Sequence, residues 1–154
     1  MTSSITTIGV IGLGTMGAGI AEVLARHGKS VIGVELDDAG SQRAKERLEG
    51  STARAVSREK LTEDERTALL DRISFTTELS DLAPAQMVIE AVVESVEVKK
   101  QIIKDLDAIV GPDAILATNT SALSVTELST ANSKPGRVIG LHFFNPATVQ
   151  NLVE

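Results

Sequence analysis

The chain has 154 residues, of which 42% are apolar, and its formal net charge is −6 at pH 7, so it is long enough for one domain with a substantial core. This apolar content argues against disorder, and the negative charge argues against a general nucleic-acid surface. The sequence contains no cysteine, which excludes disulfides, thiol nucleophiles and zinc–thiolate sites and fits a reducing cytoplasm. We expect no metal site. We also expect no signal peptide or membrane-spanning helix, because the first residues include no Lys or Arg and glycines interrupt their apolar stretch.

Apolar runs alternate with helical periodicity along most of the chain. The apolar runs predict strands at residues 6–11, 30–35, 73–77, 87–92, 114–118 and 137–143. The helical patterns predict helices at residues 16–27, 38–57, 63–71, 97–110 and 123–130. This alternation predicts an α/β fold of the Rossmann type, with a doubly wound, mainly parallel sheet and right-handed crossovers.

Residues 36–72 predict a hairpin of two helices inserted into this fold. Asp37 and Asp38 are interpreted as the entry to its first helix, and Thr62 to Glu65 has the spacing of a capping box for the second. The breaks between the helices are expected at Gly50-Ser51 and Glu59-Lys60.

A glycine-rich turn joins the first predicted strand to the first predicted helix and reads Gly12-Leu13-Gly14-Thr15-Met16-Gly17. Gly12 allows a sharp turn, Gly14 lets backbone approach a phosphate, and Gly17 lets the helix pack close to the strand. The helix N-terminus then offers free N–H groups and a partial positive charge to an anion. We therefore expect residues 12–17 to bind the pyrophosphate of a dinucleotide. The alternative is a turn that only changes the chain direction.

Glu35 ends the second predicted strand, 21 residues after Gly14. A carboxylate about 20 residues after the glycines is the expected partner of a ribose. It accepts hydrogen bonds from two ribose hydroxyls and repels a 2′-phosphate, so Glu35 favours NAD over NADP as the cofactor. The alternative is a solvated carboxylate at the end of a strand.

Polar residues also follow three later strands, at the edge of a parallel sheet where ligands bind. Glu94 follows the strand at 87–92, and Asn119-Thr120-Ser121 follows the strand at 114–118. The last strand ends near His142 and Asn145. These groups are expected to gather near the nicotinamide, although residues 119–121 alone would be an ordinary helix N-cap.

Only two histidines are available for acid–base chemistry. His27 precedes Gly28 at a helix C-terminus and is interpreted as a capping residue. His142 alone would more often be a structural histidine, but it is the only histidine at the expected edge of the sheet. It is therefore the candidate general base.

Together these pieces resemble the NAD-binding domain of the L-3-hydroxyacyl-CoA dehydrogenases, which include the 3-hydroxybutyryl-CoA dehydrogenases. The matching motifs are G-x-G-x-M-G-x-G-I-A at 12–21, V-I-E-A-V-V-E at 88–94, N-T-S at 119–121, G-L-H-F-F-N-P at 140–146 and L-V-E at 152–154. The resemblance covers essentially the whole chain. It implies reversible oxidation of the 3-hydroxyl of an acyl-CoA to a ketone, with hydride passing to NAD.

The resemblance implies roles for individual residues. It makes His142 the general base and Glu154 its carboxylate partner, with a turn through Pro146 folding residues 151–154 back beside 137–143. It implies that Ser121 holds the substrate oxygen and that Asn145 lies near the nicotinamide and the reacting centre. Glu94 and Lys99 match further cofactor contacts.

At the CoA end, Ser51 falls where the family has a serine that contacts CoA, and Arg58 falls where a lysine is usual. Arg58 keeps the positive charge that a phosphate needs, with a different donor geometry. A solvated helix face with scattered charge is the open alternative.

Family members continue into a mainly helical domain that completes the acyl pocket and forms a homodimer. The resemblance therefore implies that residues 1–154 are the cofactor domain of a longer enzyme. We expect this chain alone to bind NAD and to turn over acyl-CoA substrates poorly. The expected partner is an acyl-CoA, with no nucleic acid and no membrane. The family reaction serves fatty-acid β-oxidation as well as butyrate, polyester and aromatic metabolism, so the pathway and the acyl chain length stay open.

Two other functions remain as alternatives. Residues 12–17 alone also suit Rossmann dehydrogenases of free hydroxy acids such as 3-hydroxyisobutyrate, which rely on a lysine in a later domain. The second alternative is a non-catalytic NAD-binding module. Because a mere binder needs no proton acceptor, the set of His142, Glu154, Ser121 and Asn145 favours an enzyme.

Overall fold

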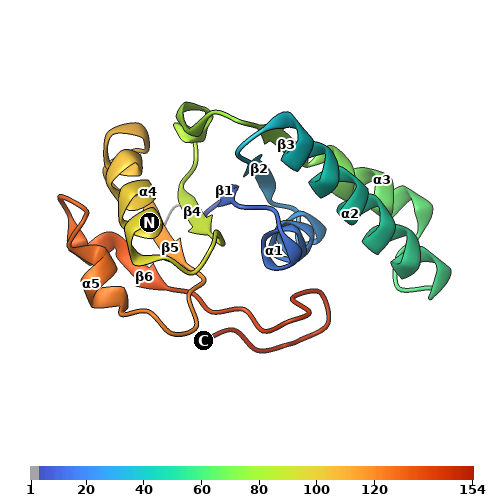
Figure 1. Cartoon of the computed structure of the whole chain (residues 1–154). Coiled ribbons are helices and arrows are strands. Elements are labelled where there is room, and N and C mark those ends of the chain that lie inside the picture. The colour runs from blue at the N-terminus through green and yellow to red at the C-terminus, as the bar shows by residue number, and fades with distance from the viewer. Residues whose placement is uncertain (1–3) are drawn as a thin grey trace.

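The computed structural model describes residues 4–154, which contain six strands and five α-helices. The strands are β1 (Thr7–Ile11), β2 (Ser30–Val34), β3 (Ile73–Thr76), β4 (Met87–Glu90), β5 (Ile115–Thr118) and β6 (Val138–Gly140). They form one sheet in the order β3-β2-β1-β4-β5-β6, and every neighbouring pair is parallel (Figure 1). The predicted Rossmann-type fold is confirmed. Because the order reverses between β1 and β4, the loops after these strands diverge and leave a crevice, where such folds bind ligands.

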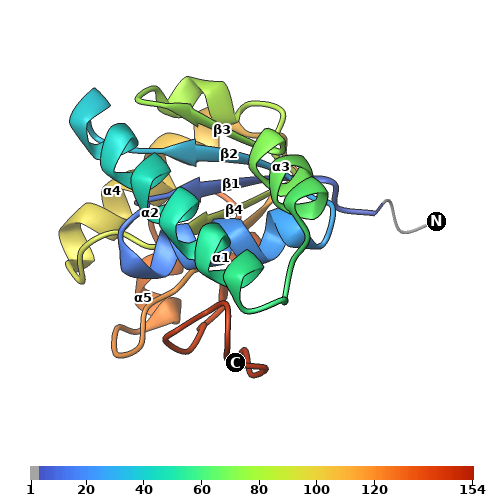
Figure 2. The ribbon, with the colours of Figure 1, turned by 90° about the vertical axis from the view of Figure 1, so that its right-hand side faces the viewer.

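Helices cover both faces of the sheet. The α-helices are α1 (Thr15–Arg26), α2 (Asp38–Ser57), α3 (Glu63–Asp71), α4 (Val96–Ile109) and α5 (Val125–Ser129). Two short 3-10 turns that the sequence did not predict are η1 (Leu79–Leu82) and η2 (Pro135–Arg137). Helices α1, α2 and α3 lie on one side and α4 and α5 on the other, and Figure 2 shows the α2–α3 hairpin in front of α1. Within residues 4–154, no helix is long and apolar enough to cross a membrane.

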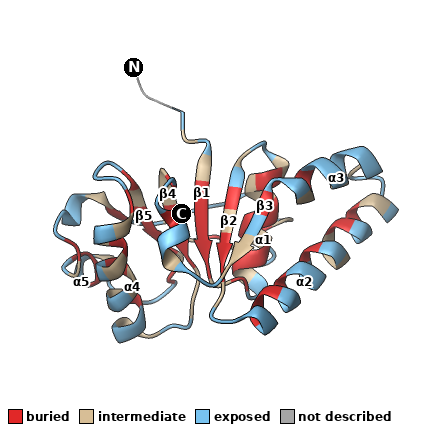
Figure 3. Cartoon of the chain, turned by 90° about the horizontal axis from the view of Figure 1, so that it is seen from above, coloured by how far each residue is buried: buried red, intermediate tan, exposed pale blue. Residues whose placement is uncertain are grey.

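Two apolar clusters, one on each face of the sheet, hold these layers together. On the α1 side, Val10 and Ile20 are completely buried, and Leu48 of α2 packs into the same cluster. On the other side, Ile103 of α4 and Leu128 of α5 are buried against the sheet. Figure 3 shows the buried residues concentrated along the strands and on the helix faces turned toward them. Each such side chain stabilises the fold by roughly 1.5–3 kcal/mol.

The predicted helical hairpin is confirmed, because α2 and α3 have the predicted bounds. Asp37 caps α2, and Thr62 and Glu65 form the predicted capping box of α3. The break predicted at Glu59-Lys60 is also confirmed, since Glu59 has a left-handed backbone with a φ of 56°.

The break predicted at Gly50-Ser51 is wrong, because α2 runs through both residues. Leu48 and Thr52 flank this point, and their exposed fractions are only 1% and 0%. Packing of these two side chains outweighs the cost of about 1 kcal/mol that a glycine imposes inside a helix.

The last predicted strand is shorter than expected, while the bounds of the other elements lie within two residues of those predicted. β6 ends at Gly140, and Leu141 still donates its N–H to the carbonyl of Thr118 at 2.9 Å. Phe143 then pairs with Val153 in an antiparallel bridge. The strand stops because its backbone groups pair with the returning segment, which confirms the predicted fold-back of residues 151–154.

The turn between β1 and α1 requires two of its glycines. Gly12 has a φ of 82°, in the region that favours glycine. A Cβ at Gly17 would lie 1.7 Å from the carbonyl oxygen of Gly12, so only a glycine fits there. The close packing of α1 against the end of β1, predicted from the motif, is confirmed.

Candidate active site

The loops after β1, β4 and β5 and the segment after β6 surround a cavity of about 360 Å³ at the carboxyl edge of the sheet. We call this cavity the central cleft. Met16 lines it from α1, Glu94 from the loop after β4, and Ser121 from the turn after β5. His142 and Asn145 line it from the segment after β6. The predicted gathering of polar residues from three strand ends is therefore confirmed.

The start of α1 is open to an anion. Nothing lies within 4 Å of where a Cβ at Gly14 would be, and Gly14 and Thr15 are both exposed. The N-cap residue of α1, Gly14, makes no side-chain hydrogen bond, and the first turn of α1 contains no acidic residue. The N–H groups and the positive end of the helix dipole thus suit a pyrophosphate. The side chain of Leu13 is buried at 2% exposure, which leaves only its backbone for a cofactor contact.

Glu35, the predicted ribose contact, lies beside the glycine-rich turn. It follows β2, is half-buried, and accepts the N–H of Leu13 on Oε1 at 2.5 Å. This bond joins the carboxylate to the glycine-rich turn. A carboxylate has about four acceptor positions, so further positions remain for ribose hydroxyls.

The backbone brings His142 and Glu154 together. The N–H of His142 donates to the carbonyl of Glu154 at 2.8 Å, and the N–H of Glu154 donates to the carbonyl of His142 at 3.0 Å. Residues that exchange both bonds in an antiparallel pair lie directly opposite each other, with side chains on the same face. Nδ1 of His142 accordingly lies 3.3 Å from Oε2 of Glu154. Nε2 is then the ring nitrogen left for a proton from the cleft.

Two neighbours hold the histidine segment in place. The side-chain oxygen of Asn119, at the end of β5, accepts the N–H of Phe143 at 2.8 Å. The ring of Phe144 lies 4.7 Å from the imidazole of His142, tilted by 52°. These contacts leave the His142 side chain 28% exposed, accessible to a substrate from the cleft.

Ser121 and Asn145 are both exposed at the cleft, as a substrate contact requires. Ser121 lies in a turn that the hydroxyl of Thr120 stabilises by accepting the N–H of Leu123 at 3.0 Å. Asn145 lines the central cleft and also a second cavity beside α1.

Glu94 and Lys99 contact each other at the cleft. Nζ of Lys99 lies 3.4 Å from Oε2 of Glu94, and the exposed fractions of the two side chains are 1% and 42%. Burial of the Glu94 carboxyl raises its pKa, but the hydroxyl of Thr120 and the Lys99 ammonium outweigh this, so the pKa lies below its ordinary value of 4.5. Glu94 therefore faces the cleft as an ionised acceptor, while the charge of Lys99 is directed into the protein.

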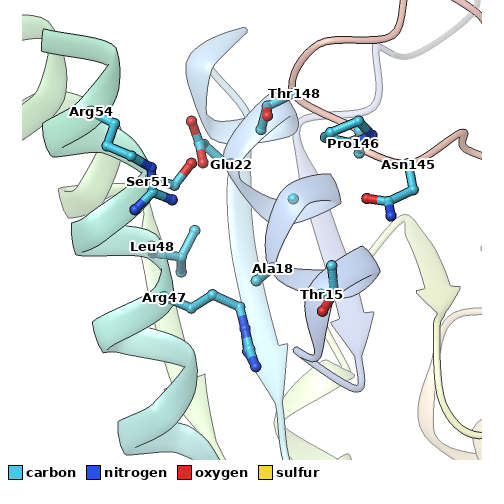
Figure 4. Close-up of a pocket in the computed structure, with 12 residues that line it drawn as sticks. Thr15, Ala18, Glu22, Arg47, Leu48, Ser51, Arg54, Asn145, Pro146 and Thr148 are labelled. Carbon is cyan, nitrogen blue, oxygen red and sulfur yellow. The ribbon is translucent and has the colours of Figure 1, made fainter. Parts of the chain in front are cut away.

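A second cavity of about 180 Å³ lies between α1, α2 and residues 145–148 (Figure 4). Ser51 and Arg54 project into it from α2, toward the buried Glu22 of α1. Arg58 is exposed at the C-terminal cap of α2 and is not among the described residues that line this cavity. The structure thus places Ser51 beside Arg54 instead of Arg58.

Two features of this region were not predicted from the sequence. One face of α2 carries Arg47, Ser51 and Arg54 at helical spacing. This spacing could have indicated that Arg54 lines the same cavity as Ser51. The second feature is Glu90. A charged residue at the end of an apolar strand indicates a buried charge that needs a partner. The Glu90 carboxylate binds the Lys99 ammonium.

Comparisons with known proteins agree on one family. The family described as "3-hydroxyacyl-CoA dehydrogenase, NAD binding domain" matches residues 7–154. A 3-hydroxybutyryl-CoA dehydrogenase of Mycobacterium tuberculosis is 48% identical over 100% of this chain and 54% of that relative. A 3-hydroxyadipyl-CoA dehydrogenase of Escherichia coli is 42% identical over 100% of this chain and 32% of that relative. The crystal structure of FadB2 from M. tuberculosis superposes with a TM-score of 0.96 and 47% identity, covering 98% of this chain and 53% of that one. The chain thus spans about half, or less, of the length of the relatives it matches.

The lowered pKa of Glu94 predicts a pH-dependent stability. A carboxylate whose pKa is lowered by folding stabilises the protein above its unfolded pKa and loses that contribution as the pH falls through the folded value. Glu94→Gln should therefore cost up to about 1 kcal/mol at neutral pH, a small value because the carboxylate is screened by solvent. Urea unfolding should show this difference from the wild type shrinking as the pH falls below 4.5.

Glu78→Gln is the matched control, since it removes the same charge from an exposed turn. A stability difference for Glu94→Gln that stays constant from neutral to acidic pH would contradict the assignment of the ion pair with Lys99.

Proposed function

Because this chain belongs to the 3-hydroxyacyl-CoA dehydrogenase family as its NAD-binding domain, we propose that it is the cofactor part of an enzyme that interconverts (S)-3-hydroxyacyl-CoA and 3-oxoacyl-CoA. Residues 1–154 form that part. A further, mainly helical domain completes the acyl pocket and makes a homodimer. The relatives' greater length supports this division, since the chain spans 54% of the M. tuberculosis relative.

The observation that carries the proposal is the contact between His142 and Glu154 at the rim of the central cleft. The 3.3 Å separation of Nδ1 and Oε2 is longer than a strong charge-assisted bond, as is common in enzymes without bound ligand. The paired backbone keeps the carboxylate opposite the imidazole.

The chemistry follows from this pair. NAD, when bound, would supply the hydride acceptor for oxidation of C3 of the hydroxyacyl group to a carbonyl. Nε2 of the neutral His142 takes the hydroxyl proton, and Glu154 holds the Nδ1–H tautomer and stabilises the imidazolium. In the reverse direction the imidazolium returns the proton to the substrate oxygen. A base positioned in this way contributes about 10²–10⁴ in rate.

Ser121 and Asn145 position the reacting groups. The hydroxyl of Ser121 donates to the substrate oxygen, and the side-chain amide of Asn145 lies near the nicotinamide. The exposure of both residues at the same cleft as His142 supports these roles. On the cofactor side, residues 12–17 hold the pyrophosphate and Glu35 the adenosine ribose. Glu94, held by the buried Lys99, contacts the nicotinamide end.

The CoA end of the substrate binds along α2. Ser51 is one contact, and the arginines of this helix supply the positive charge for phosphate. Arg54 shares the second cavity with Ser51, which supports Arg54 as the closer contact; Arg58 at the helix end is a more distant one (Figure 4).

We place the enzyme in the cytoplasm and its reaction in fatty-acid β-oxidation. The absence of cysteine from the sequence is compatible with a reducing compartment. The names of the relatives as dehydrogenases of 3-hydroxybutyryl-CoA and 3-hydroxyadipyl-CoA support an acyl-CoA substrate.

Cofactor choice is tested with this chain. NADH titrated into it should bind saturably, and NADPH should bind at least about tenfold more weakly because its 2′-phosphate meets the Glu35 carboxylate. Glu35→Gln keeps an oxygen for the N–H of Leu13 but removes the charge. It should therefore reduce the difference in affinity between NADH and NADPH. Equal affinity of the wild type for NADH and NADPH would overturn the role of Glu35.

The base is tested in the full-length enzyme, with acetoacetyl-CoA and NADH as substrates. His142→Ala should lower kcat by about 10²–10⁴, and the Kd of NADH should stay within about twofold of the wild type. His27→Ala is the matched control, because His27 only caps α1 and should leave kcat unchanged.

Three results would contradict this proposal. An unchanged kcat in His142→Ala would exclude His142 as the general base. Faster turnover of a free hydroxy acid than of acetoacetyl-CoA would favour the other dehydrogenase class. Turnover by the 154-residue chain equal to that of the full-length enzyme would show that no further domain is needed.

A further inference from the structure

A group of buried polar side chains lies directly behind the central cleft. Glu90 ends β4 and Lys99 lies in the first turns of α4, with exposed fractions of 2% and 1%. Nζ of Lys99 lies 2.9 Å and 2.8 Å from the two carboxylate oxygens of Glu90. Thr118, the neighbour of Glu90 on β5, is completely buried and donates its hydroxyl to Oε1 of Glu90. The N–H of Val92 donates to Oε2 at 3.2 Å.

Stability alone is a weak reason for such an arrangement. Desolvation of two charges costs several kcal/mol per ion, and apolar residues of similar volume often replace a buried ion pair without loss of stability. Glu90 follows Val88 by two residues on β4, and Lys99 precedes Ile103 by four on α4. Val88 and Ile103 belong to the apolar cluster on this side of the sheet, so an apolar pair would be the simpler choice here. Its contacts toward the cleft offer a different explanation.

Two routes lead from Glu90 to the turn that carries Ser121. In one, the third contact of the Lys99 ammonium is Glu94 at 3.4 Å, and Glu94 in turn accepts the hydroxyl of Thr120. In the other, the hydroxyl of Thr118 accepts the N–H of Thr120 at 3.4 Å. Both routes end at Thr120, whose hydroxyl accepts the N–H groups of Ala122 at 3.4 Å and Leu123 at 3.0 Å.

We propose that Glu90 and Thr118 are positioning residues of the central cleft. The Glu90 carboxylate holds the Lys99 ammonium, which orients Glu94 toward a hydroxyl-bearing ligand, and the Thr118 hydroxyl fixes the turn that presents Ser121. Lys99 then acts on the cofactor through Glu94 and not by its own charge. This inference rests on the proposed function, because it assumes that NAD and substrate occupy the cleft.

Thr118→Val tests the second route with little change in volume or strand preference, and Thr118→Ser restores the hydroxyl. In the free chain, amide hydrogen exchange at Leu123 should accelerate about tenfold in Thr118→Val relative to the core amide of Val10. The Kd of NADH should rise about tenfold. Thr118→Ser should return both quantities to within about twofold of the wild type.

The first route is tested with the double variant Glu90→Leu/Lys99→Met, which replaces the whole pair by apolar side chains and avoids a lone buried charge. It should fold and should raise the Kd of NADH about tenfold. This variant also keeps the proposal testable where Thr118→Val fails to fold.

Thr52→Val is the matched control, because Thr52 is an equally buried threonine whose hydroxyl donates within α2, to the carbonyl of Leu48 at 2.8 Å. It should lower stability and leave the Kd of NADH unchanged. If Glu90→Leu/Lys99→Met folds with unchanged NADH affinity, or if Thr118→Ser fails to rescue Thr118→Val, the positioning role is overturned. Failure of the wild-type chain to bind NADH would instead overturn the proposed function.

Discussion

All six strands run parallel, so each delivers its carboxyl end to one edge of the sheet. The groups of the proposed site that follow the first five strands depend on this constraint. The glycine turn follows β1, Glu35 follows β2, Glu94 follows β4, and Ser121 follows β5. Reversal of the strand order between β1 and β4 separates the loops on either side and leaves room between them for a ligand. The parallel direction of the strands thus brings residues that are far apart in the sequence to the same edge of the sheet.

The pair of His142 and Glu154 forms in another way, from a segment that leaves the sheet. Residues 141–154 turn back on themselves, and the exchange of two backbone bonds between His142 and Glu154 sets the register. In an antiparallel pair a shift of one residue would turn one of the two side chains to the opposite face. The bond from Phe143 to Asn119 ties this segment to the end of β5. The same strand end therefore positions both the proposed base and, through Thr118 and Thr120, the turn with Ser121.

Much of this could be predicted from the sequence, because local patterns determine it. Helix and strand periodicity, the glycine turn and the caps at Asp37 and Thr62 all act within a few residues. The predictions that failed depend on packing. Gly50 stays helical because Leu48 and Thr52 are buried on either side of it, and β6 ends early because Phe143 pairs with Val153. The contact between Glu90 and Thr118 could not be predicted for a similar reason, since Thr118 becomes a neighbour of Glu90 only through the register of β4 and β5. The glycine turn and Glu35 were assigned from their positions in the sequence, whereas the roles of Ser121, Asn145 and Glu154 rest on the family resemblance.

The central claim is that Glu154 holds the imidazole of His142 with its proton on Nδ1, leaving Nε2 free to act as a base. The most direct measurement is nitrogen-15 NMR of the two ring nitrogens, at a pH where the ring is neutral. We predict the proton on Nδ1 in the wild type and a mixture of both tautomers in Glu154→Ala. A proton on Nε2 in the wild type, or the same tautomer balance with and without Glu154, would contradict the claim.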